Sequence, residues 1–303
     1  MNIKEEFNRN AKNVIRKETS NPDLFVLKYH RNVFFSGKWN DFLRECRGMV
    51  IDSEWNIVSL PFCKIHNYGI EESAPVLKDR DLIVAARKVN GFMVAVTWYK
   101  DDLLWSTTGS IDSDYVKMAK GIFESWSEYE KETFSLLVKL SPNHTFLFEC
   151  VHPNDPHIVY EEPGLYFLGC RLKDTSKRGV KIYAREDTAY FWKGTPVKTV
   201  ETLITTVGEL KQLCDTVKHE GFVFHLLGDP EVASKIKSKH YLTKKFLMRV
   251  TPQKLKLRIN QMNVDEEFFP IIKKIQADQD AFAAMPEAER RAWIEQQFDW
   301  SKQ

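Results

Sequence analysis

The sequence predicts an α+β protein in which antiparallel sheets are flanked by helices and followed by a small, all-helical C-terminal module. Short β-branched and aromatic runs recur through the first part of the chain, and amphipathic helical patterns lie between them. Beyond Phe246 the pattern turns helical. We therefore divide the 303 residues into a unit of sheets and helices, 1–245, and a helical unit, 246–303.

The composition limits the class of protein. With 43% hydrophobic residues, the chain can bury one large core or two modest ones. No stretch approaches the length of an uncharged apolar span, and the N-terminus is charged, so we expect neither a membrane span nor a signal peptide. The five cysteines are odd in number and widely spaced, which favours reduced, mostly buried thiols over a disulfide or zinc framework.

The charge distribution is more informative than the net charge of +2. Nine Lys or Arg and no acid lie between Lys235 and Arg258. Such a basic stretch suits a nucleotide or a nucleic-acid backbone. A solvated surface is the alternative explanation of the same run.

The N-terminal third is expected to start with a helix and to continue as strands. Apolar residues at helical spacing predict a helix over 3–18, ahead of Pro22. Residues 24–27 read as a strand, and 47–52 with 56–60 as a hairpin. The loop 61–69, which carries Lys64 and His66, is of a kind that often carries function.

The middle of the chain is predicted to place Lys88 on a turn between two strands. Residues 82–85 and 92–98 are apolar and β-favouring, and the segment 86–91 between them is polar. Gly91 permits a sharp turn or a close approach to a ligand. Because 103–106 reads as a further strand, an antiparallel meander fits these segments.

Further elements follow from periodicity and capping. Helices are predicted with Asp112 and Ser127 as candidate caps, and strands with turn residues beside them. The predicted helices span 110–127, 127–140 and 207–219, and the predicted strands span 145–149, 164–170 and 222–226. A last helix near Pro286 has an apolar face with Trp293, Ile294 and Phe298, which we assign to ordinary packing.

Alternation predicts that Lys235, Lys237 and Lys239 share one face, opposite Ile236 and Ser238. Three ammonium groups on one face repel one another, and a core gains nothing from them. The arrangement suits a site that receives a polyphosphate.

Several of these segments, taken together, resemble the ordered motifs of the covalent nucleotidyltransferases, which comprise the ATP-dependent DNA and RNA ligases and the mRNA-capping guanylyltransferases. The segments are Arg47-Gly48, Lys64, Lys88-Val89-Asn90-Gly91, Phe148-Glu149, Leu165-Tyr166-Phe167, Glu220-Gly221 and Lys235-Ile236-Lys237. Within the superfamily the chain is most similar to the phage T4 RNA ligase 1 family, over roughly residues 30–245. The resemblance implies an ATP-grasp-like ligase domain and an enzyme that joins broken RNA in RNA repair.

The resemblance also implies roles for particular residues. Lys88 would attack the α-phosphate of ATP and become a lysyl-AMP, and the AMP would pass to a 5′-phosphate end that a 3′-hydroxyl then displaces. A lysine with an ordinary pKa of about 10.4 must supply neutral amine for that attack. We expect the like charges of Lys64, Lys235 and Lys237 to lower the pKa of Lys88. The same lysines would hold the phosphates.

The remaining implied contacts concern ATP and Mg²⁺. Val89, Asn90 and Gly91 belong to the nucleotide-binding motif around Lys88. Arg47 would contact the nucleotide or the 5′-phosphate end, and Glu149 the ribose hydroxyl. Either Tyr166 or Phe167 would flank the adenine, because alternation sends the two to opposite faces. Glu220 would contribute to a Mg²⁺ site.

Three positions depart from the family pattern. Asn90 stands where an aspartate is usual, which keeps the turn-forming amide but removes a negative charge. Thr108 stands where the family often has a lysine, and His66 where an aromatic residue is common. By resemblance we further expect a monomer that acts on RNA ends in the cytoplasm of a bacterial or phage-infected cell.

Other functions were weighed against this one. His152 and His157 could be metal ligands, but flanking prolines and an unsuitable spacing argue against it. The chain lacks Walker-type and dinucleotide-binding glycine motifs. A DNA ligase or capping enzyme normally appends an OB-fold where this chain reads as helices. A catalytically idle nucleic-acid-binding protein on the same scaffold is the alternative of a different class.

Overall fold

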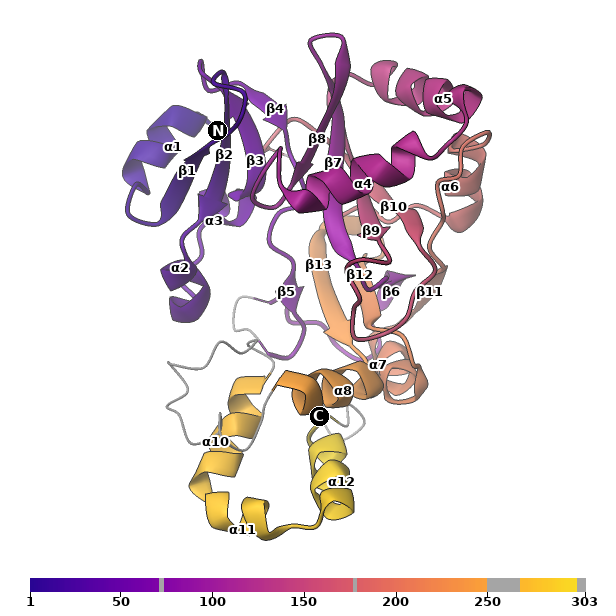
Figure 1. Ribbon diagram of the computed structural model, residues 1–303. Coiled ribbons are helices and arrows are strands. Elements are labelled where there is room, and N and C mark those ends of the chain that lie inside the picture. The colour runs from indigo at the N-terminus through magenta and orange to yellow at the C-terminus, as the bar shows by residue number, and fades with distance from the viewer. Residues whose placement is uncertain (71–73, 177–178, 250–267, 299–303) are drawn as a thin grey trace.

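Three sheets, antiparallel except for one parallel strand pair, form the upper part of the molecule in Figure 1 with their covering helices, and a group of helices lies below them. The structure is a computed structural model that describes residues 1–70, 74–176, 179–249 and 268–298. This arrangement confirms the predicted α+β class with a helical C-terminal part. In the described part of the chain, no helix has the length and hydrophobicity that crossing a bilayer requires.

The N-terminal sheet has the strand order β1-β2-β3-β4. Three short helices, α1, α2 and α3, lie in the same part of the chain. A core that includes Phe42, Met49 and Ile51 fills one face of this sheet. The strands span Val14–Glu18, Leu24–Tyr29, Arg47–Asp52 and Ile57–Ser59, and the helices span Ile3–Arg9, Arg31–Ser36 and Asp41–Glu45.

The predicted helix over 3–18 is wrong in its second half. Helix α1 ends at Arg9, and Asn10 takes a non-helical conformation. The side-chain amide of Asn10 donates to the carbonyl of Glu6 at 2.9 Å. Val14 then opens strand β1, which pairs with β2. The β-branched pair Val14-Ile15 and a long-range partner outweigh the local helical spacing.

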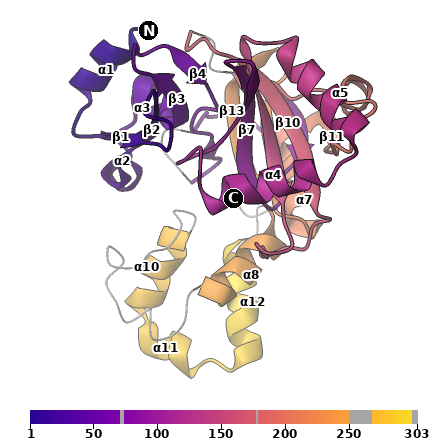
Figure 2. The same cartoon turned by 45° about the horizontal axis from the view of Figure 1, so that its top comes forward.

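The middle sheet has the strand order β10-β9-β7-β8 and carries an aromatic core that includes Phe134, Phe148 and Trp192. Its strands span Phe92–Tyr99 (β7), Asp102–Thr107 (β8), His144–Val151 (β9) and Gly164–Leu172 (β10). The accompanying helices span Asp114–Glu124 (α4), Glu128–Lys139 (α5) and Arg185–Phe191 (α6). Figure 2 shows α4 and α5 on the outer side of this sheet.

Of the two predicted helix caps, Ser127 is confirmed and Asp112 is wrong. Ser127 caps α5 with a complete capping box, as expected. Helix α4 instead begins after Ser113, and Asp112 accepts hydrogen bonds from the Ser110 hydroxyl and the Ser20 amide. Asp112 therefore joins two loops rather than capping α4.

The five-stranded sheet has the order β11-β6-β12-β13-β5, in which β5 is parallel to β13. Its strands span His66–Asn67 (β5), Leu82–Arg87 (β6), Thr202–Thr206 (β11), Gly221–Leu226 (β12) and Asp229–Lys237 (β13). The expected meander is therefore wrong at its first step: β7 and β8 form a hairpin, but β6 and β7 belong to different sheets. Periodicity identified both strands and could not identify their partners.

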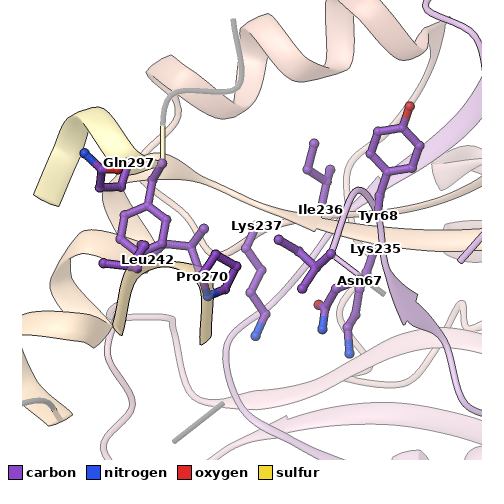
Figure 3. Close-up of a pocket in the computed structure, with 11 residues that line it drawn as sticks. Asn67, Tyr68, Lys235, Ile236, Lys237, Leu242, Pro270 and Gln297 are labelled. Carbon is purple, nitrogen blue, oxygen red and sulfur yellow. The ribbon is translucent and has the colours of Figure 1, made fainter. Parts of the chain in front are cut away.

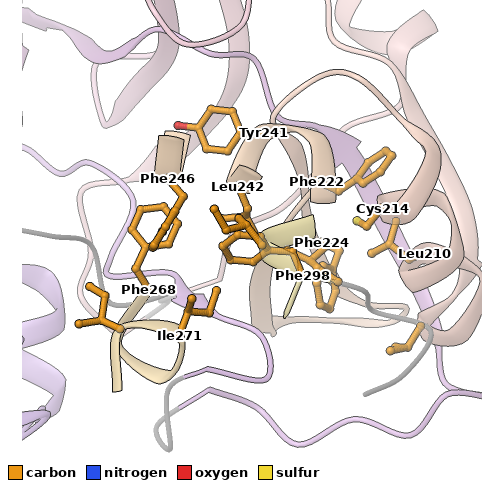
Figure 4. Packing of buried hydrophobic residues seen from close by; sticks show 14 of the residues in the cluster. Leu210, Cys214, Phe222, Phe224, Tyr241, Leu242, Phe246, Phe268, Ile271 and Phe298 are labelled. Carbon is orange, nitrogen blue, oxygen red and sulfur yellow. The ribbon is translucent and has the colours of Figure 1, made fainter. Parts of the chain in front are cut away.

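Helix α7 and the C-terminal helices pack on the five-stranded sheet. Helix α7 spans Val207–Thr216, and the C-terminal helices span Lys239–Arg249 (α8), Phe269–Ala277 (α10), Gln279–Ala284 (α11) and Glu287–Gln297 (α12). Phe222 and Phe224 of β12 share one core with Phe246, Phe268 and Phe298 of the helical part, as Figure 4 shows. The proposed division at 245/246 falls inside α8, so whether the two units fold independently stays a prediction.

The middle and five-stranded sheets meet across a small apolar cluster. Ala95 and Leu147 of the middle sheet pack there with Phe62 and Val180, and Val223 of β12 borders them. The chain passes from one sheet to the other between β6 and β7. Met93, near the start of β7, packs against the same cluster.

Candidate functional site

A cavity of about 120 Å³ lies between the middle and five-stranded sheets. One part of its wall is apolar and includes Met93, Leu168 and Val223. The other part is charged, with Arg47, Arg87, Lys88, Glu149 and Lys235. A cavity with an apolar side and a charged side can hold a base and phosphates at the same time.

Lys88 lies on the segment that crosses from β6 to β7, as the sequence predicted for a turn between strands. Its amide donates to the carbonyl of Gly221 at 2.8 Å, which holds the segment against β12. A Cβ on Gly91 would lie 2.2 Å from the carbonyl oxygen of Cys150. Only a glycine allows β7 to start this close to β9.

The amine of Lys88 lies between two carboxylates. Its Nζ is 3.0 Å from Oε2 of Glu220 and 4.0 Å from Oε1 of Glu149, and 22% of its side chain is exposed. Burial favours the neutral amine, but Glu220 and Glu149 outweigh burial and raise the pKa of Lys88 above its ordinary value. The expected net lowering of the Lys88 pKa is therefore wrong for this structure, whereas the expected contribution of a like charge is present for Lys237, which acts to lower this pKa.

The pKa values of the two carboxylates are shifted in opposite directions. Burial raises the pKa of Glu149, and the charge of Lys88 only partly offsets it. Burial acts the same way on Glu220, but Lys88 and Lys237 outweigh it and lower the pKa of Glu220. Of the two carboxylates, Glu220 is the one whose ionised form the neighbouring lysines favour, and it makes the shorter contact with Lys88.

Asn90 links Glu220 to the backbone of Val159 by two hydrogen bonds. Its amide nitrogen donates to Oε2 of Glu220 at 2.8 Å, and its amide oxygen accepts from the backbone of Val159 at 3.0 Å. The amide of Gly91 donates to Oε1 of Glu149 at 3.2 Å. An asparagine can donate to the carboxylate, which an ionised aspartate cannot do.

Lys235 and Lys237 lie on β13 beside a second cavity of about 60 Å³ between this strand and the C-terminal helices. Figure 3 shows their amines and the amide of Asn67 reaching in the same direction. Lys235 also lines the Lys88 cavity. The predicted alternation holds from Ser234 to Ser238, whereas Lys239 belongs to α8 and not to the strand.

Lys64 lies outside the Lys88 cavity. It is buried on the wall of an adjoining cavity of about 310 Å³, which also contains Arg44 and His66. The Lys64 amine lies 5.2 Å from the ring centroid of Phe34 and 5.4 Å from that of Trp39. Ile65 and Val180 line both cavities, so Lys64 is a neighbour of the site rather than part of the charge around Lys88.

Tyr166 and Phe167 lie on opposite faces of β10, as alternation predicts. Tyr166 packs with Val89 and Val151, and Phe167 belongs to the aromatic core of the middle sheet. Neither of the two lines the Lys88 cavity, whereas Leu168 does. Their role toward a bound base stays a prediction.

The sequence interpretation missed two charged residues at the site. Arg87 lines the cavity and pairs with Glu161 at 2.5 Å. Lys245 of α8 is buried, and its charge helps to lower the pKa of Glu220. The basic run that begins at Lys235 contains Lys245, but its proximity to Glu220 depends on how α8 packs.

The two carboxylates are suited to a divalent cation. Mg²⁺ is commonly held by one or two carboxylates together with substrate phosphates. Glu149 and Glu220 both approach the amine of Lys88 and so face the same point. His157, in contrast, pairs with Asp155 at 2.8 Å in a separate segment.

Comparisons with known proteins give one relative by sequence and several structures with the same fold. No family model matches the chain. A curated protein named RNA ligase from Rhodothermus phage RM378 is 27% identical over 199 residues, which cover 54% of this chain. The match covers 45% of that relative, so the chain spans about half the length of the curated protein it matches.

Solved structures share the fold at low sequence identity. Two forms of an archaeal ATP-dependent RNA ligase are each 14% identical, with TM-scores of 0.57 and 0.58, and cover 97% of this chain and 76% of theirs. A candidate ATP-dependent DNA ligase from Aquifex aeolicus is also 14% identical, with a TM-score of 0.55, and covers 98% of this chain and 76% of its own.

The chain therefore has the same fold as these solved structures, which are named ATP-dependent RNA and DNA ligases. The relative found by sequence is named RNA ligase, in agreement with the resemblance of the motifs. The narrower assignment to the phage T4 RNA ligase 1 family stays a prediction.

Proposed function

We propose that this protein is an ATP-dependent RNA ligase, acting in RNA repair, that joins 5′-phosphate and 3′-hydroxyl RNA ends through a lysyl-AMP intermediate. One observation carries the proposal. Lys88 lines a cavity that has an apolar wall and a cationic wall, and two carboxylates lie beside the Lys88 amine and influence its protonation. Once it has lost its proton, an amine in this position can act as a nucleophile toward a phosphoanhydride.

In the first step Nζ of Lys88 attacks the α-phosphorus of ATP. A P–N bond forms, the P–O bond to pyrophosphate breaks, and the amine loses a proton. The apolar residues Met93, Leu168 and Val223 would accommodate the adenine. Lys235 and Lys237 would neutralise charge on the phosphates and on the leaving pyrophosphate.

The ion pair with Glu220 must weaken before Lys88 can attack, because the ammonium form has no lone pair to donate. Lys237 and Lys245 are the cations of this chain that compete for Glu220, since both lower its pKa. Mg²⁺ held by Glu149 and Glu220 together with phosphate oxygens would supply further positive charge toward the α-phosphate. Release of Glu220 from Lys88 leaves the buried amine favouring its neutral form.

The next two transfers regenerate the enzyme. An oxygen of the RNA 5′-phosphate attacks the phosphorus of lysyl-AMP, and the P–N bond breaks to leave an adenylylated end. The 3′-hydroxyl of the second RNA end then attacks the 5′-phosphate, forms the phosphodiester bond and displaces AMP. Arg47 on the cavity wall would hold the 5′-phosphate in both transfers.

Self-labelling tests this proposal directly. The protein is mixed with α-labelled ATP and Mg²⁺, denatured and separated on a gel. We expect label on the wild-type chain, none on Lys88→Ala, and full label on Lys117→Ala, a control in which an exposed lysine of α4 is removed. Label that survives Lys88→Ala would refute the nucleophile.

The substrate class is tested by sealing. The adenylylated protein is given 5′-phosphorylated RNA and DNA of the same sequence, as a linear single strand, a nicked stem-loop and a splinted duplex. We expect an RNA product that resists phosphatase. Sealing of DNA alone would indicate a DNA ligase, and no label with retained RNA binding would indicate a non-catalytic binding protein.

A further inference from the structure

One face of the N-terminal sheet carries a basic strip that runs toward the Lys88 cavity. In the sheet register Lys28 is opposite Arg47, Ile15 is opposite Lys28, and Lys17 is opposite Val26. Residues directly opposite in an antiparallel pair share a face. Lys17, Lys28 and Arg47 therefore project from the same side of the sheet.

That side is the one turned toward the middle sheet. Val26 and Val50 on it pack with Tyr99 and Leu104 of the β7–β8 hairpin. The opposite face is covered by the core to which Ile3 of α1 contributes. The basic strip therefore lies on the same face of the N-terminal sheet as the apolar contact with the middle sheet.

The strip meets the turn after β8. Nζ of Lys17 donates to the carbonyl of Gly109 at 3.1 Å, and Nζ of Lys28 lies 3.7 Å from the place where a Cβ on Gly109 would be. A Cβ on Gly48 would lie 2.7 Å from Cα of Thr108, so the backbone beside Arg47 touches the same turn. The amines of Lys17 and Lys28 and the backbone next to Arg47, from three adjacent strands, therefore meet at Thr108-Gly109.

This turn also carries one of the three departures from the family pattern. The resemblance places a lysine at this position, and the chain has a threonine. Lys17 and Lys28 bring ammonium groups to the same turn from β1 and β2. The acid near Lys17, Asp112, is already bonded to the Ser110 hydroxyl and the Ser20 amide.

The strip extends beyond the nucleotide cavity. Arg47 lines that cavity and is half-buried, whereas Lys17 and Lys28 are exposed. Lys17 lies on β1 and Arg47 on β3, which are two strand spacings, or about 10 Å, apart. A ligand that contacts the whole strip must carry several negative charges along an extended chain.

We infer that Lys17, Lys28 and the Thr107–Ser110 turn bind the phosphodiester backbone of the RNA strand whose 5′-phosphate reaches Arg47. This inference rests on the proposed ligase function, because it assumes that the 5′-phosphate enters the Lys88 cavity. Backbone contacts of this kind supply affinity without sequence preference and depend strongly on salt.

The test measures RNA binding as a function of salt. A fluorescent, 5′-phosphorylated single-stranded RNA is titrated with the full chain in the absence of ATP at several salt concentrations. For Lys17→Gln/Lys28→Gln we expect the slope of log K against log salt to shrink by about 1.4, since each contact to a single strand contributes about 0.7. DNA of the same sequence should show the same change, because the proposed contacts are to backbone phosphates, which RNA and DNA share.

A matched pair of substitutions controls for net charge. Lys4→Gln/Lys12→Gln removes two exposed lysines from α1 and the segment after it, and α1 packs on the other face of the sheet. This variant should keep the wild-type slope. An unchanged slope in Lys17→Gln/Lys28→Gln, or an equal change in the control, would overturn the inference.

Labelling with α-labelled ATP separates this inference from the proposed function. Both double variants should label as the wild type does. A parallel loss of label in Lys17→Gln/Lys28→Gln would mean that the strip binds ATP instead of RNA. Absence of label on the wild type, with the slope difference intact, would reject the ligase proposal and retain the strip as a nucleic-acid site.

Discussion

At the scale of single residues, the amine of Lys88 and the carboxylate of Glu220 form the central pair of the site. Their 3.0 Å contact keeps the lysine charged in the unliganded protein. A raised lysine pKa means that the pair stabilises the fold at neutral pH and that this contribution is lost as pH rises through the folded-state pKa. The contact stabilises the fold while it is intact, whereas the proposed attack requires that it weaken so that the amine can become neutral.

Glu220→Gln should lower the pKa of Lys88. Burial and Lys237 both favour the neutral amine, and Glu149 at 4.0 Å would be the remaining carboxylate beside it. The ε-carbon shift of labelled Lys88 in the unliganded protein, followed against pH, measures this directly. Glu162→Gln, which removes an acid that accepts from Tyr160, should leave the titration unchanged. A Lys88 titration that does not move in Glu220→Gln would contradict the assigned cause.

Gly91→Ala should destabilise the protein by about 1–3 kcal/mol, because the new methyl group has no space. The obstructing atom is a backbone carbonyl 2.2 Å away, which cannot rotate aside. Urea unfolding measures the change. Gly121→Ala is the matched control: nothing lies within 4 Å of its added Cβ, and a helical position should gain up to about 1 kcal/mol.

At the scale of elements, a buried ion pair joins the N-terminal sheet region to the middle sheet. Arg171 of β10 donates to both carboxylate oxygens of Glu45 in α3, at 2.6 and 2.8 Å, and to the carbonyl of Pro61 at 2.8 Å. Both side chains are almost completely buried. Glu45 lies two residues before Arg47, so this pair also orients the start of β3.

Arg171→Met should cost about 3–5 kcal/mol of unfolding free energy, because it leaves the charge of Glu45 buried without a partner. Glu45→Leu/Arg171→Met should recover a large part of that loss, since no charge then remains buried. Urea denaturation of the two variants gives the comparison. Equal losses would mean that packing, and not the uncompensated charge, sets the cost.

At the scale of the whole molecule, the described C-terminal helices and the five-stranded sheet share a core. Ile272 of α10 is completely buried in the same cluster as Phe222 and Phe224 of β12. A shared core couples the unfolding of the two parts. The helical part would then support the strand that carries Lys235 and Lys237.

Ile272→Ala should lower the free energy of unfolding by about 2–5 kcal/mol. Because the core is shared, the slowest-exchanging amides of β12 should lose protection by a similar amount in hydrogen exchange. Tyr190→Ala, at a side chain that is 82% exposed, should change neither measurement. Wild-type protection in β12 of Ile272→Ala would instead support two independent units, 1–245 and 246–303.

The sequence by itself determined the local elements and the order of the site motifs. Runs of apolar, β-favouring residues located β2, β3, β7, β10 and β12, and Ser127 as a candidate cap located the start of α5. These features depend on neighbours within a few residues, which is the range that periodicity and capping report.

The tertiary structure alone decided which strands pair and which charges meet. It separated β6 from β7, converted the second half of the expected first helix into β1, and set two carboxylates against Lys88. It also gathered Lys17, Lys28 and Arg47 on one face. Strand pairing and pKa depend on groups far apart in the chain, and their distances are settled only when the sheets pack.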